Sequence, residues 1–259
     1  MLVALVSARG SPGVTTAALA LTLTWPSAVV LAEVDPAGGT ILPGYLAGVL
    51  PADRGIRELA VAALRGDDLA AVWWGQLIDL APPARQRLLL PGITDPAAAG
   101  ALAPVWDQLA AWLASLGRSE SGHDVLADCG RLVSRHTPWP LLAAADAVLL
   151  VLPATLAGLA AATPAVAALR SGLAGHRPAK LGLLLCGRAD QSTRTVAAEL
   201  GTPVVSILPH DPRTARVLSD GGTLRGGALL RAAAESHQHL RGHLRRATAA
   251  AMQRAGEPT

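Results

Sequence analysis

The feature that most constrains this fold is a short apolar run near the start of the chain that leads into a glycine-rich loop. The run, Leu2–Val6, has the length and composition of a buried strand. The loop follows at residues 7–16, Ser-Ala-Arg-Gly-Ser-Pro-Gly-Val-Thr-Thr, and Ala17–Thr24 then has helical composition until Pro26 ends it. Strand, glycine-rich loop and helix in this order form the framework in which main-chain N–H groups bind phosphate.

The residues of this loop suit phosphate and magnesium at all but one central position. Gly10 and Gly13 let successive N–H groups turn inward, and Thr15 stands where the hydroxyl of such a loop binds Mg²⁺. Position 14, where a lysine normally reaches the β- and γ-phosphates, holds Val14. The only lysine in the chain is Lys180, at the start of a different predicted strand. Taken alone, the loop fits a degenerate nucleotide site and an ordinary strand–turn–helix connection equally well.

Two further segments place carboxylates where predicted strands end. The apolar run Ala28–Glu33 leads to Asp35, and the run Asp124–Asp128 ends in an aspartate that Gly130 follows two residues later. Ligands of open parallel sheets bind at the carboxyl ends of the strands. We therefore expect both aspartates at the same edge of the sheet as the glycine-rich loop.

In this order the three segments resemble the deviant-Walker-A ATPases of the MinD, ParA and TadZ/CpaE group. The loop of that group typically reads Lys-Gly-Gly-x-Gly-Lys-Thr-Thr, and this chain has Arg-Gly-Ser-Pro-Gly-Val-Thr-Thr at residues 9–16. The likeness continues through residues 33–38, which are similar to the group's Asp-x-Asp-Pro-Gln-Gly, and through Asp128, in the place of a Walker B aspartate, to the strand at 147–153. It covers roughly the first four-fifths of the chain.

The resemblance implies an α/β fold of the P-loop NTPase (SIMIBI) type, a doubly wound, mainly parallel sheet flanked by helices. It implies ATP and Mg²⁺ as ligands and a homodimer formed around the nucleotide. In the roles of that group, Asp35 positions the attacking water, Thr15 binds Mg²⁺, and Asp128 holds the ion through water. The implied cofactor-binding residues are Arg9, Gly10, Ser11, Pro12, Gly13, Val14, Thr15 and Thr16.

The departures from the group concern charge and hydrogen bonding. Arg9 keeps the positive charge of the lysine that crosses to the partner's phosphates in the group's dimers, whereas Val14 replaces the other lysine with an apolar side chain. Pro12 has no N–H to donate, and Gly187 stands where the group often has a base-recognising asparagine. One cationic group at a phosphoryl-transfer site contributes on the order of hundredfold to thousandfold in rate. We therefore expect hydrolysis to be slow or absent.

The order of the predicted elements indicates one α/β unit. About half of the 259 residues are apolar, and strands that alternate with helical stretches are typical of a mainly parallel sheet. We expect a MinD/ParA-like P-loop NTPase domain at residues 1–226 and a C-terminal helix with a short tail at residues 227–259. Seven parallel strands are predicted, at Leu2–Ser7, Ala28–Glu33, Arg87–Leu90, Asp124–Asp128, Ala147–Leu152, Lys180–Cys186 and Val204–Leu208.

An uncharged stretch between Asp146 and Arg170 is long enough to span a bilayer. Pro153 divides it into a strand-like segment and an alanine-rich helix, each too short to span, so we predict a strand and a helix instead. The start of the chain lacks the basic region of a secretory signal, and Arg9 interrupts its apolar run. We therefore expect a cytoplasmic protein.

Two features leave alternatives open. Trp73 and Trp74 lie next to each other on helical sequence, either as bulky core residues or as an exposed pair on a partner surface. The predicted C-terminal helix has a Leu/Ala stripe and arginines mostly off it; it packs on its own domain, binds anionic lipid at the inner face of the membrane, or contacts DNA. On that helix Glu235, His239 and His243 have metal-like spacing, but without further carboxylate or cysteine partners we expect solvated surface.

Three functions therefore remain. The first is a nucleotide-operated positioning protein that dimerises and localises a chromosome or plasmid segment or a Tad/Flp-type pilus and secretion machine. The second is a nucleotide-independent pseudo-ATPase scaffold of the same fold. The third is a nucleic-acid-binding module, for which a net charge of only +3 gives weak support. The retained loop hydroxyl and the two aspartates favour the first, and the missing lysine favours the second.

Overall fold

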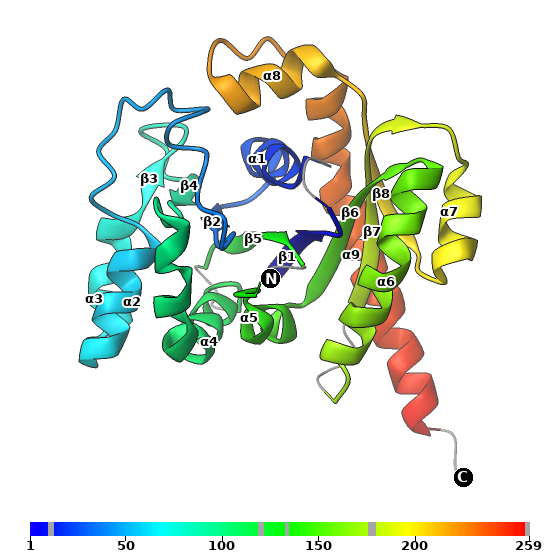
Figure 1. The fold of residues 1–259 in the computed structure, drawn as a ribbon, viewed down its shortest axis with the longest axis horizontal. Helices are drawn as coiled ribbons and strands as arrows, with labels where there is room; N and C mark the ends of the chain where they lie inside the picture. Colours follow the sequence, from blue (N-terminus) through cyan, green and yellow to red (C-terminus); the bar gives the residue numbers. More distant parts are fainter. Residues whose placement is uncertain (10–12, 119–121, 133–134, 176–179, 257–259) are drawn as a thin grey trace.

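The strands of the chain form one twisted sheet with helices on both faces (Figure 1). The computed structural model describes residues 1–9, 13–118, 122–132, 135–175 and 180–256. Within them the sheet has eight strands in the order β3-β4-β2-β5-β1-β6-β7-β8. The strands are β1 (Leu2–Ser7), β2 (Val29–Glu33), β3 (Ile78–Asp79), β4 (Arg87–Leu90), β5 (Asp124–Arg131), β6 (Ala147–Ala154), β7 (Lys180–Ala189) and β8 (Val204–Pro209).

The α-helices and two 3-10 helices complete the described part of the chain. They are α1 (Val14–Thr24), α2 (Ile56–Arg65), α3 (Leu69–Trp73), η1 (Trp74–Gln76), η2 (Pro96–Val105), α4 (Trp106–Leu116), α5 (Trp139–Ala144), α6 (Leu156–Gly172), α7 (Thr193–Leu200), α8 (Pro212–Asp220) and α9 (Ala228–Gly256). Helices α1, α8 and α9 share one apolar cluster with the sheet, and α2 to α7 share the other. The two clusters therefore lie on opposite faces of the sheet.

The central strands read as continuous apolar runs because they are buried on both faces. In β1, Leu2, Ala4 and Val6 belong to one cluster, whereas Val3 and Leu5 belong to the other. Complete burial of a Leu or Val side chain contributes roughly 1.5–3 kcal/mol. This strand therefore fixes the position of the loop that follows it from both sides.

The predicted α/β fold is confirmed, and all seven predicted strands are present and parallel to one another. The sequence analysis missed β3, which pairs antiparallel with β4 at Ile78 and Asp79. A strand of two residues is too short to show a hydrophobic period. The uncharged stretch forms β6 and α6, as predicted. None of the described helices is both long and apolar enough to cross a membrane.

Burial bears on the two alternatives that the sequence left open. Trp73 is 1% exposed and Trp74 is 49% exposed, so one indole packs in the core and the other faces solvent. Helix α9 packs on β8 and α1 through Leu229, Ala233 and Leu240, which are buried. His243 is also buried, contrary to the solvated position expected for it, because it lies on the same packed face of the helix.

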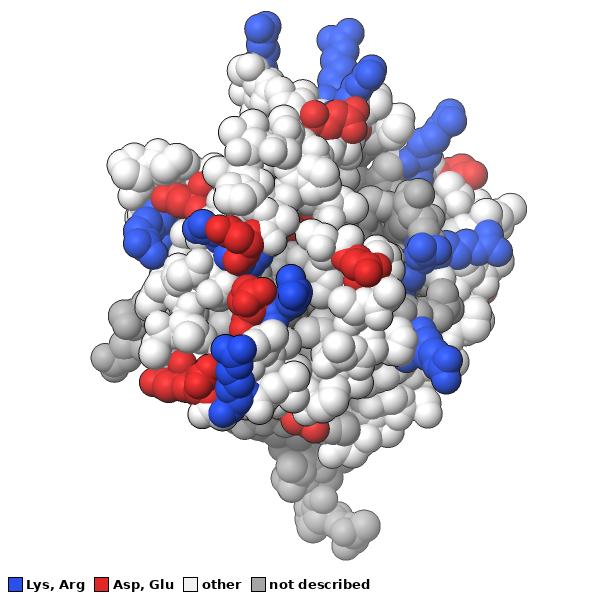
Figure 2. All heavy atoms as spheres, turned by 60° about the vertical axis from the view of Figure 1, so that its left-hand side comes forward, with Lys and Arg blue, Asp and Glu red and all other residues white. Residues whose placement is uncertain are grey.

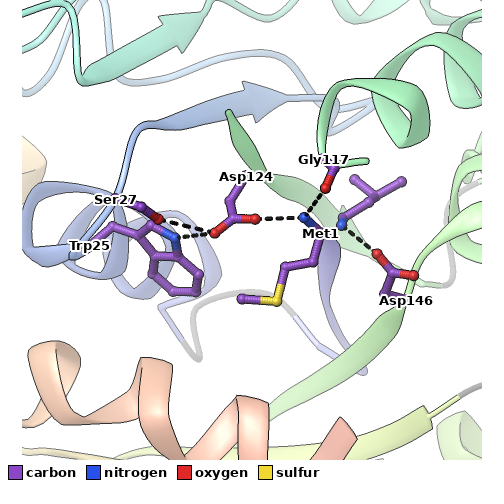
Figure 3. A network of polar contacts seen from close by, with 7 residues as sticks. Met1, Trp25, Ser27, Gly117, Asp124 and Asp146 are labelled. Carbon is purple, nitrogen blue, oxygen red and sulfur yellow. Dashed lines mark hydrogen bonds and ion pairs between the residues drawn. The ribbon is translucent and has the colours of Figure 1, made fainter. Parts of the chain in front are cut away.

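A polar network fixes the amino ends of β1 and β5 at the edge of the sheet opposite the glycine-rich loop (Figure 3). The amine of Met1 donates to the Asp124 carboxylate at 2.5 Å and to the carbonyl of Gly117 at 2.9 Å. The indole of Trp25 and the hydroxyl of Ser27 donate to the other oxygen of Asp124, at 2.9 and 3.2 Å. Burial raises the pKa of Asp124, but these hydrogen bonds and the amine charge outweigh it and hold the pKa below its usual value.

Candidate functional site

The candidate site lies where β1, β2 and β5 end, because these three strands are neighbours in the sheet. The register pairs Asp128 with Leu5 on one side and with Glu33 on the other. The glycine-rich loop follows β1, and Asp35 follows β2 by two residues. The carboxylates predicted from the sequence therefore meet the start of α1 at one edge. Of the predicted cofactor-binding residues, Gly10, Ser11 and Pro12 lie outside the described part of the chain.

Thr15 and Asp128 form the central contact of the site. The Thr15 hydroxyl donates to the Asp128 carboxylate at 2.5 Å, and the Gly130 N–H donates to its other oxygen at 3.0 Å. Asp128 is buried, and burial raises its pKa to about 7 despite these two hydrogen bonds, with the charges of Asp35 and Glu33 adding to the rise. None of the ion pairs among the described residues involves these three acids. The site therefore carries negative charge that a bound cation would stabilise.

Asp35 lies against the backbone of Gly130. A Cβ added to Gly130 would be 2.0 Å from the Asp35 carboxyl carbon, and Gly130 has a φ of +62°. The Asp35 carboxylate also accepts the N–H of Ala37 at 2.8 Å. Because only glycine leaves room at position 130, this residue brings Asp35 close to Asp128.

Glu33 has a structural role that the sequence analysis did not predict. Its side chain is 2% exposed, and it accepts N–H groups from Thr40 at 2.8 Å, Ile41 at 3.0 Å and Gly92 at 3.4 Å. Burial raises the pKa of Glu33, and the three hydrogen bonds oppose that rise. The carboxylate closes the loop of residues 34–40, which carries Asp35, on the end of its own strand. Such a clamp depends on how the loop folds back, and no local sequence pattern predicts it.

The amino end of α1 has the properties of an anion site. Gly13 precedes the helix with a φ of +88° and no side-chain cap, and the first turn contains no acidic residue. The first helical hydrogen bond runs from Ala17 to Gly13, so the N–H groups of Val14, Thr15 and Thr16 have no acceptor within the helix. These groups and the positive end of the helix dipole favour a bound anion.

Two of the predicted loop residues, Val14 and Arg9, differ in exposure, and only the exposed one is charged. Val14 is 6% exposed, and its side chain packs in the same apolar cluster as α1 and α8. Arg9 is exposed, and its carbonyl accepts the hydroxyl of Ser7 at 2.8 Å. The apolar side chain at position 14 therefore forms part of the core, and Arg9 is the charged side chain available at the described start of the loop.

The oxygen ligands at this edge are of the kind that Mg²⁺ prefers, a hydroxyl and carboxylates. Within the described ranges, no group of three or more His, Cys, Asp or Glu side chains is placed to hold a metal ion. Mg²⁺ usually keeps several waters and binds one or two carboxylates together with substrate phosphates. Thr15 and the uncompensated carboxylate of Asp128 fit an ion bound in that way.

Gly187, which stands where the resembled group often has a base-recognising asparagine, lies near the end of β7, and the turn at residues 208–213 leads from β8 into α8. Gly187 has a φ of +79°, with open space around the position of a Cβ. Asp211 caps α8 by accepting the N–H of Thr214 at 3.1 Å, and it also accepts the N–H of Leu229 in α9 at 3.3 Å. The turn at 208–213 is therefore the proline-bounded start of α8 and ties that helix to α9.

The chain has the fold of ATPases of known structure. A scan against protein-family models gave no match, and neither did a search of curated protein sequences. The ParA family ATPase from Chlorobium tepidum TLS superimposes with a TM-score of 0.69 at 16% identity, over 92% of this chain and 98% of that one. MinD from Pyrococcus horikoshii OT3 in complex with Mg-ADP gives 0.64 at 18% identity, over 94% and 98%. A Cyanothece McdA variant in complex with ATP gives 0.65 at 19% identity, over 93% and 96%. At these identities the likeness establishes the fold, which is that of the MinD and ParA ATPases.

Proposed function

We propose that this chain is a MinD/ParA-like positioning protein that binds ATP and Mg²⁺ at a lysine-free loop and dimerises around the nucleotide. Its cargo is a chromosome or plasmid segment or a Tad/Flp-type pilus and secretion machine, and it acts in the cytoplasm or at the inner face of the membrane. The observation that carries the proposal is the Thr15–Asp128 contact beside the uncapped start of α1. The solved complexes of MinD with Mg-ADP and of McdA with ATP, which share the fold, support it.

In this proposal each residue has one role. The N–H groups at the start of α1 bind phosphate oxygens, and Thr15 and Asp128 hold Mg²⁺, which neutralises phosphate charge when bound. Asp35 orients a water molecule at the γ-phosphate, and the exposed Arg9 reaches the phosphates of the partner copy. Arginine suits that role because its forked donors bind phosphate in two places at once.

Slow or absent hydrolysis follows from the environment of position 14. Val14 is packed in the core and brings no charge to the phosphates. Catalysis of phosphoryl transfer depends on positive charge placed on the transferred group, worth several kcal/mol for one cation. Binding relies mainly on main-chain N–H groups and the ion, so it survives the loss of the lysine better than turnover does.

A second candidate is a nucleotide-independent scaffold of the same fold. The observation that favours it is the clamp at Glu33, which holds the loop of Asp35 through hydrogen bonds within the protein. A loop that is closed in advance has less to change when a nucleotide binds. Membrane or DNA contact has weaker support, and the described side chains on the face shown in Figure 2 mix both signs of charge without a continuous basic surface.

The two candidates are separated by titrating ATP–Mg²⁺ into the purified protein by calorimetry while its mass is followed by sedimentation. For the first candidate we expect micromolar binding that Asp128→Ala abolishes, and a dimer that Arg9→Ala weakens. Arg65→Ala is the matched control, because Arg65 is exposed at the end of α2, and that helix begins at the edge of the site. No binding at millimolar ATP, with an unchanged mass, would leave the scaffold.

A further inference from the structure

A second surface of the molecule lies far along the sheet from the candidate site, at the free edge of β8. In Figure 1 this strand is at the right, between α7 in yellow and α9 in orange and red. A groove of about 630 Å³, here called the β8 groove, follows that edge. Its lining consists of Thr193, Arg194 and Ala197 from α7, residues 203–207 from β8 and its approach, and Ala232, Glu235 and His239 from α9.

The floor of the β8 groove offers main-chain hydrogen-bonding groups. The N–H of Leu183 in β7 donates to the carbonyl of Pro203 at 2.9 Å, and Leu183 is paired with Val204. In a parallel ladder with this bond and register, the N–H and C=O of Val204 face away from β7. No strand of the described chain pairs with β8 on that side. At Val204, the outer edge of β8 therefore presents the groups that a further strand uses.

The side chains of β8 lack the charges that often protect an edge strand from pairing, although Pro209 ends the strand and its register with β7 shifts by one residue after Val204. Such strands commonly carry lysines or inward-pointing charges, whereas β8 reads Val-Val-Ser-Ile-Leu-Pro. Ile207 is 47% exposed. Ser206 is buried and bonds to Ser236 at 2.8 Å and to Nδ1 of His239 at 3.3 Å, which fixes the α9 side of the groove. The groove is thus a rigid, partly apolar channel along an unpaired edge.

The two walls of the groove carry opposite charges. Arg194 is exposed on the α7 wall and Glu235 is exposed on the α9 wall. Neither takes part in an ion pair among the described residues. In an extended chain, successive side chains point to opposite faces. A strand placed in the groove would therefore direct neighbouring side chains to Arg194 and to Glu235.

We propose that the β8 groove binds an extended segment of a partner protein, which pairs with β8 as a ninth strand of the sheet. The segment carries an acidic side chain that meets Arg194 and, next to it, a basic side chain that meets Glu235. Main-chain hydrogen bonds supply affinity in this mode of recognition, and side chains on the two walls supply specificity. The proposal concerns a different surface from the nucleotide site and does not depend on nucleotide binding.

The shape of the groove favours a single strand over a second copy of the chain. A second copy would bring its own α7 and α9, which flank its β8 in the same way. Because both helices line the groove, the helices of two copies would meet before the two β8 strands reached the ~4.8 Å spacing of a ladder. An extended peptide has no such flanking elements.

Peptide selection tests the proposal directly. A phage-displayed library of random 12-residue peptides is selected on the nucleotide-free full-length protein, with counter-selection against Ile207→Lys, and synthetic binders are measured by fluorescence anisotropy. We expect neighbouring acidic and basic residues in the selected peptides and at least tenfold weaker binding to Arg194→Glu, regained when the acidic residue of the peptide is replaced by lysine. Arg216→Glu and Leu156→Lys, at exposed positions on α8 and α6, should bind like the unaltered protein.

Hydrogen exchange and sedimentation complete the test. Bound peptide should slow exchange of the Val204 amide, and thermal melts should show that each variant remains folded. The proposal is overturned if no selected peptide discriminates against Ile207→Lys, if Arg194→Glu binds the peptides unchanged, or if the Val204 amide exchanges at the same rate with peptide bound. A dimer that Ile207→Lys dissociates would make a second copy the occupant and would also overturn it.

Discussion

At the scale of single residues, the site depends on two positions where a larger or a charged side chain would change it. Gly130 lacks the Cβ that would collide with Asp35, and Val14 lacks the charge that a phosphate loop normally has. Thr15 was predicted from its place in the glycine-rich loop, and Asp35 and Asp128 from the strand ends. The structure brings the three to one edge as expected. The need for glycine at position 130 could not be predicted in full from the sequence, because it comes from the contact of Gly130 with Asp35 at the ends of two strands.

Gly130→Ala should destabilise the protein by roughly 2–4 kcal/mol, since it combines a positive φ with a collision at the Asp35 carboxyl group. Gly187→Ala is the matched control, because its φ is also positive but no atom lies within 4 Å of the added Cβ. For that variant we expect a cost of only about 1 kcal/mol. Urea denaturation of the two variants measures the difference, and equal costs would show that Asp35 does not lie where the structure places it.

Val14→Lys tests whether the missing charge limits turnover. If ATP binds as proposed, a lysine at this position should raise the rate of phosphate release on the order of hundredfold, at some cost in stability because Val14 is buried. Val14→Met is a control of similar length without charge, and it should leave the rate unchanged. The interpretation fails if the two variants release phosphate at the same rate while both still bind nucleotide.

At the scale of elements, strands were easier to predict than loops. Strands buried on both faces appear as uninterrupted apolar runs. Strand β3 has only two residues, so it can be recognised only by its pairing with β4. The loop after β2 is held by Glu33 through hydrogen bonds to Thr40, Ile41 and Gly92, which come from two separate segments. Contacts of that kind depend on tertiary structure. The sequence therefore placed the Glu33 carboxylate at the end of a strand but did not show that it holds the loop.

Glu33→Ala should release the loop of residues 34–40 by leaving three N–H groups without their acceptor. We expect a loss of about 2–4 kcal/mol in the free energy of unfolding and faster hydrogen exchange at the amides of Thr40 and Ile41. Glu33→Gln keeps one acceptor oxygen, so its exchange rates should lie between those of Glu33→Ala and the unaltered protein. Unchanged exchange at both amides in Glu33→Ala would show that other contacts hold the loop.

At the scale of the whole molecule, the two ends of the central strands differ in how their acids titrate. At the carboxyl edge, burial raises the pKa values of Asp128 and Glu33 and outweighs their hydrogen bonds. At the amino edge, hydrogen bonds from the Met1 amine and the Trp25 indole overcome burial and lower the pKa of Asp124. One sheet therefore carries acids that destabilise it when charged and an acid that stabilises it when charged.

These opposite shifts predict the stability of the nucleotide-free protein as pH changes. A group whose pKa is raised by folding stabilises the protein at pH values below the pKa that it has in the unfolded chain. For Asp128 this stabilisation is lost as the pH rises through its folded pKa of about 7. Asp124, with a lowered pKa, contributes stability at higher pH that is lost as the pH falls below about 4. The melting temperature should therefore be highest near pH 4, should fall as the pH rises from about 4 to about 7, and should change little from there to pH 8.

Asp128→Asn identifies the group responsible for the fall between about pH 4 and 7. The variant keeps an acceptor for Thr15 but has no carboxylate to ionise, so its melting temperature should exceed that of the unaltered protein at pH 8 and match it near pH 4. Asp107→Asn, at an exposed position on α4, serves as the control and should follow the unaltered protein. Bound Mg–ATP should reduce the fall in the unaltered protein, because the cation compensates the charge of Asp128, and should have no such effect on Asp128→Asn. A melting temperature that stays constant from pH 5 to 8 in the presence of a chelator would contradict the idea that this carboxylate is held in the fold without a compensating charge.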